Sequence, residues 1–347
     1  MVSADAHTAR AENRDWGFWS EDERLELWEA YVRLRRDDWD MRFGKQPVRW
    51  GRAEDIGPID NFTPENRREY LRFNRAARKI PVWALQGVYT AAPFSYEAIV
   101  QPSFEPSPLA PSGSNWRPRR LVALDEAGWT VREDKPSDAS VWAQRVRHRT
   151  DDFEAGVSHA YHYNQTPALR MRPAQSEVLL DYRRQHTFGA DVALLENGSA
   201  LFAEGAYTTR EPFETNDPGS TDRVALRDIL SLVVGFDHAL DDATRVGVQW
   251  AMRNIVNDRS QLVANAFEHA VLGQIRRTVP GEKLELGVSG RYWFDPHGYI
   301  LSPEIAFRLH ERIRIRAMLD LYGGSRDSEP GQFRDNDQWG LELTVVF

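Results

Sequence analysis

The chain is organised as a succession of segments of about ten residues in which apolar side chains recur at every second position. The C-terminal segment DQWGLELTVVF shows the pattern most clearly. One of its faces consists of Trp339, Leu341, Leu343, Val345 and Phe347, and the other of Gln338, Gly340, Glu342 and Thr344. A repeat of two residues is typical of a β-strand whose two faces meet different surroundings. The pattern therefore predicts an all-β fold.

Fifteen segments of the chain are expected to be strands on this basis. They are 27–35, 39–50, 82–91, 95–103, 140–149, 153–164, 184–195, 199–211, 229–240, 244–255, 267–278, 283–294, 299–309, 313–323 and 337–347. Fifteen strands close into a ring too wide for side chains alone to fill, whereas a water-filled or plugged lumen suits a ring of that size. This width favours a lipid-facing exterior over a soluble sandwich or a small soluble barrel.

The connections between these segments alternate in length. The short ones lie at 36–38, 92–93, 151–152, 196–198, 241–242, 280–281 and 311–312. The long ones lie at 51–81, 105–138, 165–182, 212–228, 257–265 and 324–336, and 295–298 is the one short link on that side. Tight turns at one end and long loops at the other are typical of outer-membrane barrels. We therefore predict a transmembrane antiparallel β-barrel of about 15–16 strands with short periplasmic turns and long extracellular loops.

Aromatic residues and composition agree with a barrel in the outer membrane. Girdles of aromatic side chains are expected at both membrane interfaces. The residues placed there are Trp50, Trp83, Trp293, Tyr299, Tyr322 and Trp339 beside the long loops, and Trp39, Phe94, Phe153 and Phe347 beside the short turns. The absence of cysteine excludes disulfides, thiolate metal sites and a cysteine nucleophile, and a net charge of −8 argues against binding to nucleic acid.

Several segments resemble one particular family of outer-membrane barrels. They are FGKQPVRWGRAEDIGPIDNFTPENRREYL, RKIPVWALQGVY, FEPSPLAPSGSNW, YHYNQTPAL and DYRRQHTFGADVA. The matching positions are Gly44, Gln46, Val48, Trp50, Gly51, Asp55, Asp60, Pro81, Trp83, Glu105, Pro106, His186, Gly189, Ala190 and Asp191. In these residues the chain is similar to the Gram-negative family catalogued as domain of unknown function 1302. The resemblance implies an outer-membrane location and a porin-like or transport role, without a substrate.

The resemblance covers residues 25–347, which we assign to the barrel, and it departs from the family at the N-terminus. Members of the family normally carry a signal peptide and further strands before the region that begins at Leu25. We expect residues 1–24 either to be partly disordered or to complete the barrel, with a closing strand hidden within 10–20. The alternative is a truncated or split chain whose missing N-terminal strands come from a partner chain.

Two stretches have a helical alternative. Ser20 to Glu23 form a capping box, but the alternation from Trp28 to Leu34 favours a strand there. Thr63 and Pro64, followed by residues 67–78, predict a short helix in the mouth of the barrel.

Charged side chains on the polar face of the C-terminal strands are the positive functional signal. We expect the following residues to line the lumen: Arg245, Gln249, Arg253, Glu285, Arg291, Arg314, Arg316, Asp320 and Glu342. Opposed rows of arginine and carboxylate set ion and solute selectivity in channels. The plainer interpretation is that they pair with one another and stiffen the barrel. The loops 51–81 and 105–138 are candidates for an inward constriction or plug.

Motifs for catalysis or metal binding are missing from the sequence. His159 and His162 stand three residues apart, so on a strand they point to opposite faces and cannot hold one ion. His186, His238, His269 and His310 are isolated in the sequence. The predicted function is a porin-like channel or passive transporter for a small solute, with no cofactor. Its partners would be outer-membrane lipid, lipopolysaccharide and the insertion machinery. An outer-membrane phospholipase or protease, or a plugged structural barrel, is the alternative.

Overall fold

The structure is a computed structural model that describes residues 2–9, 22–54, 56–60, 62–68, 78–137, 139–256, 261–281 and 283–345. Within these residues sixteen strands form one antiparallel sheet in chain order, with β6, β9 and β10 set apart from it. The strands of the large sheet are β1 (Val2–Ala9), β2 (Asp22–Arg36), β3 (Trp39–Gln46), β4 (Val82–Ala91), β5 (Phe94–Gln101), β7 (Val141–Arg149), β8 (Phe153–Tyr163), β11 (Arg184–Glu196), β12 (Ser199–Glu214), β13 (Val224–Ala239), β14 (Thr244–Ile255), β15 (Phe267–Thr278), β16 (Leu284–Phe294), β17 (His297–His310), β18 (Ile313–Gly324) and β19 (Gln338–Val345). The predicted antiparallel barrel of 15–16 strands is confirmed.

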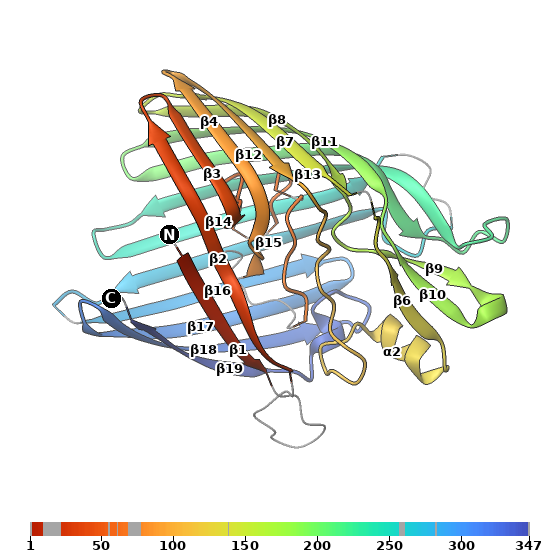
Figure 1. Cartoon of the computed structure of the whole chain (residues 1–347). Coiled ribbons are helices and arrows are strands. Elements are labelled where there is room, and N and C mark those ends of the chain that lie inside the picture. Colours follow the sequence, from red (N-terminus) through yellow and green to blue (C-terminus); the bar gives the residue numbers. More distant parts are fainter. Residues whose placement is uncertain are drawn as a thin grey trace.

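The two ends of the barrel differ as the loop lengths predict. Figure 1 shows both termini at the end that carries the tight turns, which is the periplasmic end. The long loops gather at the opposite, extracellular end. There the helix α2 (Arg119–Glu126) packs near a small sheet of β6 (Thr130–Asp134), β10 (Glu177–Asp181) and β9 (Ala168–Arg172). This extracellular layer was not predicted, because its strands are five residues long and its elements lie in two different loops.

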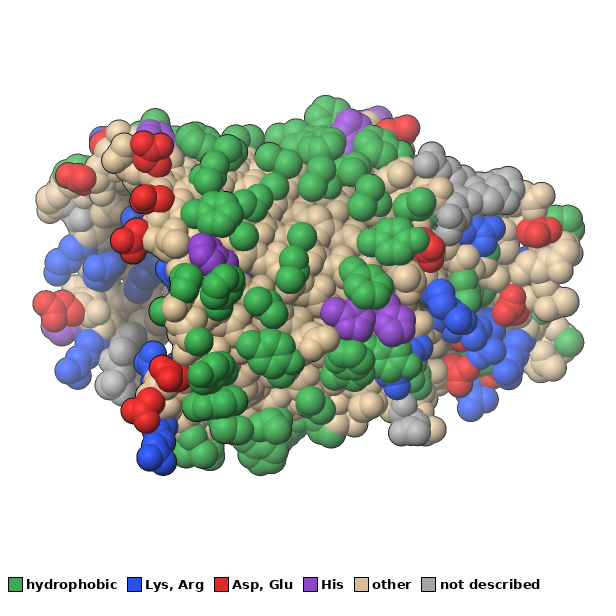
Figure 2. Space-filling model, turned by 90° about the horizontal axis from the view of Figure 1, so that it is seen from above, with side chains coloured by type: hydrophobic (Ala, Val, Ile, Leu, Met, Phe, Trp, Pro, Cys, Tyr) green, Lys and Arg blue, Asp and Glu red, His purple; other side chains and the backbone are tan. Residues whose placement is uncertain are grey.

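The alternation of side chains divides the sheet into an apolar outside and a polar inside. On β19 the outward Leu341 is 69% exposed, and the same face carries Trp339 and Leu343. Figure 2 shows one outer surface covered by hydrophobic side chains, with most charged side chains towards the two ends. An apolar belt of this kind suits contact with lipid. Pairing between neighbouring strands from β1 to β19 satisfies the backbone groups that face one another within the sheet. The chain is an outer-membrane protein.

Three aromatic residues do not lie where the girdles were predicted. Trp50, Trp293 and Tyr322 are buried at 2%, 9% and 4% exposure, inside the barrel. Strand alternation explains why two of them are buried, because successive residues of a strand point to opposite faces. Tyr292 and Leu321 face outward, so Trp293 and Tyr322, which follow them, face inward. Trp83, Tyr299 and Trp339 do lie on the outer face beside the loops, as do Trp39 and Phe94 beside the turns.

The N-terminal region adds a strand to the fifteen predicted segments. β1 pairs with β2 and supplies the sixteenth strand, whereas the segment 10–20, where a closing strand was predicted, lies outside the described residues, as does Phe347. The strand predicted from Trp28 to Leu34 is confirmed within β2.

The helix predicted from Thr63 is wrong at its beginning. Glu65 and Arg67 form isolated β-bridges with Lys79 and Leu109, so the chain is extended there, and residues 69–77 lie outside the described part. Bridges to neighbouring segments satisfy the backbone in place of helical hydrogen bonds. In the described part of the chain, the structure has no helix that is long and apolar enough to span a membrane.

Candidate functional site

The connection between β3 and β4, residues 47–81, folds into the barrel instead of extending from its rim. Its apolar residues Val48, Trp50, Ile59 and Phe62 are at most 3% exposed. They pack in one cluster with inward-facing residues of β4, β5, β7, β8 and β12, which include the small side chains Ala84, Ala143, Ala160 and Ala206. Alanine at these inner positions leaves room for the loop beside the wall. We call residues 47–81 the lumen loop.

The lumen loop reaches the opposite wall as well. Ala53 is completely buried and packs, with Ile56, against Phe202 and Leu272 of β12 and β15. Its contacts therefore extend from β4 around to β15. The prediction that the long loop after β3 folds inward agrees with this geometry, and the loop narrows the lumen.

A carboxylate on the wall holds the turn of the lumen loop. Glu204 of β12 accepts hydrogen bonds from the backbone N–H groups of Arg52 and Ala53, the latter at 2.9 Å. The Arg52 guanidinium donates to Glu154 of β8 at 2.6 Å. Gly51 makes the approach possible: its φ is +83°, and a Cβ there would lie 2.7 Å from the Glu204 carboxyl carbon. Only glycine adopts this backbone conformation at little cost and leaves the space free.

A buried lysine fastens the returning arm of the loop. Lys79 is 6% exposed and donates from Nζ to the backbone oxygen of Asp60 at 2.8 Å, and it lies 3.4 Å from a carboxylate oxygen of Glu65. A buried ammonium group is stable only when it is paired and hydrogen-bonded. The loop is thus fixed at both arms by charge as well as by apolar packing.

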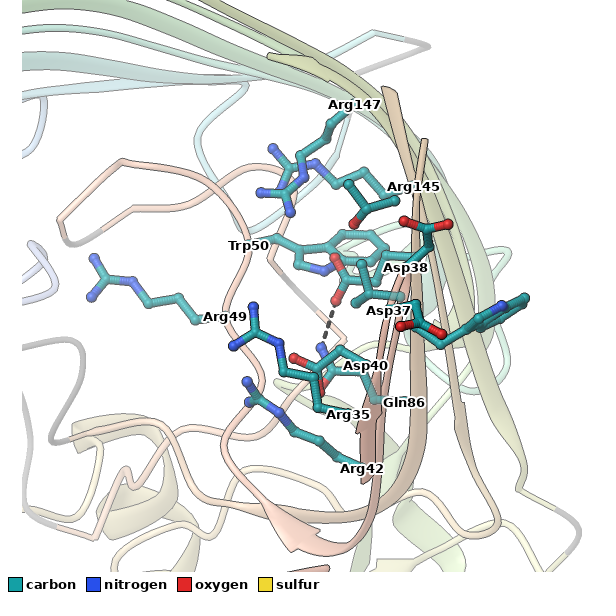
Figure 3. A pocket seen from close by; sticks show the side chains of 14 residues that line it. Arg35, Asp37, Asp38, Asp40, Arg42, Arg49, Trp50, Gln86, Arg145 and Arg147 are labelled. Carbon is teal, nitrogen blue, oxygen red and sulfur yellow. Dashed lines mark hydrogen bonds between the residues drawn. The ribbon is translucent and has the colours of Figure 1, made fainter. Parts of the chain in front are cut away.

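Two cavities lie on either side of the lumen loop. The larger, about 1110 Å³, opens towards the extracellular loops and is lined by loop residues such as Ile56 and Asp60 and by Arg253 and Arg291 of the wall. The smaller, about 340 Å³, lies towards the periplasmic end and is bounded by Trp50 and by charged residues of β2, β3, β5 and β7 (Figure 3). We call this smaller space the periplasmic cavity.

The structure places the predicted lumen residues on the inner face of the sheet, where most of them bind one another or their neighbours. Arg314 donates to Glu285 at 2.5 Å, and Arg316 binds Glu342 and lies 3.5 Å from Glu304. These contacts join strands β16 to β19 through alternating charges on the inner wall.

The other predicted residues have separate surroundings. Arg253 lies 3.6 Å from Glu211, and Asp320 accepts a hydrogen bond from Ser302 at 2.5 Å. Gln249 accepts one from the backbone N–H of Glu54 in the lumen loop at 3.2 Å. Arg291 is buried, and its guanidinium lies over the ring of Trp293. For Arg245 the described residues supply no ion pair. Their part in permeation stays a prediction.

A second set of inward charges was missed. Arg33, Arg35, Arg42, Arg145 and Arg147 lie on the inner face of β2, β3 and β7. The signal was present in the sequence, because VRLRR and QRVRHR each carry arginine at every second position. The predicted lumen set is confined to residues 245–342, so these N-terminal rows lie outside it.

The histidines lie partly as expected. His159 and His162 point to opposite faces, as predicted: His162 bonds Thr187 inside the barrel at 2.9 Å, whereas His159 lies outside. His186 is not isolated, because its Nδ1 lies 3.0 Å from Nε2 of His159 on the neighbouring strand. In the described part of the chain no three His, Cys, Asp or Glu side chains gather as metal ligands.

Comparison with known proteins identifies the family. The model of the family described as "Protein of unknown function (DUF1302)" matches residues 20–347. The chain belongs to this family. No curated protein matches the sequence of this DUF1302 member.

Solved structures show the same fold at low sequence identity. The Pseudomonas aeruginosa protein OpdK, crystallised with vanillate, superimposes with a TM-score of 0.53 and 10% identity, over 91% of this chain and 77% of that one. Another structure of OpdK gives 0.52 and 10%, over 91% and 78%. Identity this low shows the outer-membrane barrel fold alone.

Proposed function

We propose that this DUF1302 protein is a passive, porin-like channel that lets small solutes cross the outer membrane. The observation that carries the proposal is the inner wall, which has rows of charged side chains where the outer face is apolar. Charged rows keep a lumen hydrated and set which solutes pass. The lumen loop narrows the passage between its two cavities, so we expect a small conductance rather than that of an open ring.

The proposed channel also implies how the protein reaches and contacts the membrane. The barrel would be inserted by the outer-membrane insertion machinery and would contact lipid and lipopolysaccharide through its apolar belt.

Single-channel recording in a planar lipid bilayer tests the channel. We expect discrete current steps that grow with salt concentration, and larger steps from a variant in which a short Gly/Ser linker replaces residues 49–78. Silence from a folded wild-type barrel, together with conduction by the loop variant, would contradict an open channel and identify a plugged barrel. Silence from both, with the fold intact, would refute an aqueous passage altogether.

The inner charges are tested by ion selectivity. The double variant Arg314→Gln, Arg316→Gln leaves Glu285 and Glu342 without these partners. We expect the reversal potential in a salt gradient to shift towards cation selectivity, because two positive charges leave the wall. An unchanged reversal potential in a folded barrel would contradict a role in permeation, and loss of folding would favour the packing role.

A hydrolase remains the second candidate because of one contact. Ser199 Oγ and His238 Nδ1 lie 2.8 Å apart across β12 and β13, near the periplasmic turns. A serine nucleophile needs a base at this distance, and the base in turn needs an orienting group. Among the described residues no carboxylate bonds to His238. Absence of phospholipid and peptide hydrolysis by the folded wild type excludes this candidate; hydrolysis that Ser199→Ala abolishes would establish it.

A further inference from the structure

The periplasmic cavity is a small space lined mainly by charged and polar side chains, away from the paired wall of β16 to β19. Five arginines and four carboxylates line it. The arginines are Arg35, Arg42, Arg49, Arg145 and Arg147, and the carboxylates are Asp37, Asp38, Asp40 and Glu97. The numbers of positive and negative groups are nearly equal, but the two kinds of group differ in how many direct hydrogen-bond or ion-pair partners they have.

The carboxylates are mostly occupied by groups other than these arginines. Asp40 accepts from Arg33, at 2.9 Å from its Nε. Glu97 accepts from the Gln86 side-chain amide at 2.6 Å, and Asp37 lies 3.7 Å from Arg36 at the rim. Neither Arg33 nor Arg36 lines the cavity.

The arginines have fewer direct partners, although Asp40 acts on Arg35 and Arg42, and Glu154 on Arg147, at longer range. Arg145 pairs with Asp191 at 2.7 Å, and Arg49 lies 3.7 Å from Glu54. For Arg35, Arg42 and Arg147, the described residues supply no carboxylate within 4.0 Å. These three come from β2, β3 and β7, and Figure 3 shows their side chains projecting from the wall towards the interior.

Such a cluster has a definite chemical preference. Positive groups that face a cavity with low-dielectric walls focus a positive potential within it. A guanidinium group presents a planar fork that matches a carboxylate with two parallel hydrogen bonds. The lining comes from strands, from the turn at Asp37 and Asp38, and from the lumen loop at Arg49 and Trp50. Among the described residues no helix N-terminus contributes to it, so the helix-end donors typical of many phosphate sites are missing there.

We propose that the periplasmic cavity is a binding site for small organic carboxylates, held by Arg35, Arg42 and Arg147. The inference rests on the proposed channel, since it names the class of solute that passes below the lumen loop. A volume of about 340 Å³ falls in the range of small-molecule sites. Trp50 closes the site on the side of the loop and lies 5.9 Å from the Arg145 guanidinium.

Calorimetric titration of the full-length barrel in detergent tests the site without requiring conduction. The probe is succinate, and its neutral counterpart is succinamide. We expect saturable binding of succinate and at least tenfold weaker binding of succinamide. The triple variant Arg35→Gln, Arg42→Gln, Arg147→Gln should weaken succinate binding at least tenfold. The reason is that it removes the charged hydrogen bonds from the guanidinium groups to the succinate carboxylates, which are stronger than hydrogen bonds between neutral groups.

A matched control removes the same charge elsewhere. Arg277, Arg312 and Arg334 are exposed and do not line the cavity, so their replacement by Gln should leave succinate affinity unchanged. Equal affinity of both triple variants, or equal binding of succinate and succinamide, would overturn the proposal. Inorganic phosphate that binds more tightly than succinate would also overturn it. Intact succinate binding by a barrel silent in bilayers would refute the channel alone, and conduction without such binding would refute the site alone.

Discussion

Replacing Gly51 by alanine tests whether the lumen loop is held by its turn against Glu204. The residue has φ +83°, and the added Cβ would lie against the carboxylate that accepts the N–H groups of Arg52 and Ala53. The variant therefore imposes two costs at one point: backbone strain, and displacement of the acceptor.

The size of the effect follows from those two costs. A residue other than glycine in the left-handed region costs about 1–2 kcal/mol. Losing one hydrogen bond to a charged acceptor costs about 1.5 kcal/mol or more. Together they amount to roughly 3 kcal/mol, which corresponds to a change of about 150-fold in an equilibrium constant.

The turn should open while the rest of the loop stays in place. Val48, Trp50, Ile59 and Phe62 are buried, and large apolar side chains contribute about 1.5–3 kcal/mol each. Their sum of roughly 8 kcal/mol exceeds the cost imposed at Gly51. We therefore expect a local opening rather than ejection of the loop.

Hydrogen exchange of the peptide that contains Arg52 and Ala53 measures this opening. We expect its protected amides to exchange about 100-fold faster in Gly51→Ala, with little change around Phe62. Gly113→Ala is the control, because Gly113 has φ +82° but no heavy atom within 4 Å of an added Cβ. If the exchange of Arg52 and Ala53 is the same in Gly51→Ala and wild type, Glu204 does not hold the turn and the reasoning fails.

Three further variants probe other parts of the fold. Trp50→Ala removes a side chain that is 2% exposed, and such a loss lowers the free energy of unfolding by about 3–5 kcal/mol. We expect the lumen loop to loosen and the single-channel conductance to rise. An unchanged conductance would show that the loop keeps its place without Trp50. Arg117 holds the pKa of Asp125 below its usual range through a hydrogen bond. The stability that Asp125 gives the extracellular layer is therefore full above about pH 4 and lost as the pH falls through the lowered pKa. Amide exchange in this layer, measured from pH 5 to 2 and corrected for intrinsic rates, should speed up at low pH in the wild type but not in Asp125→Asn, and an equal rise in both proteins would contradict this role of Asp125. Leu341→Arg on the lipid face should lower the free energy of unfolding in lipid vesicles by about 2–4 kcal/mol, whereas Thr344→Arg on the inner face should have a smaller effect; equal losses would contradict the assignment of faces.

The barrel was predictable because a single repeat carries it. On each strand lipid meets one face and the lumen meets the other, so polarity alone separates Leu341 from Glu342. The errors arose where residue type was given more weight than that repeat. Trp293 was assigned to the girdle for being a tryptophan, although Tyr292 beside it already occupies the lipid face.

The contacts of the lumen could not be predicted, because they join residues distant in sequence. Arg52 and Glu204 lie 152 positions apart, and nothing local specifies that this carboxylate meets that turn. An indirect signal existed: Val48, Trp50, Ile59 and Phe62 are apolar residues in a connection with no strand repeat, and such residues need a surface to cover them.

The same loop connects the two proposals physically. Trp50 is packed edge-on against Phe62 in the lumen loop, with ring centroids 4.8 Å apart. Its ring centroid also lies 5.9 Å from the guanidinium of Arg145, which lines the periplasmic cavity. Packed interiors do not deform continuously, so a displacement of Trp50 must also move that wall of the cavity. If both proposals hold, we expect a solute that fills the periplasmic cavity to shift Trp50, and with it the lumen loop that narrows the passage. Succinate binding should then change single-channel conductance in the wild type and not in Trp50→Ala.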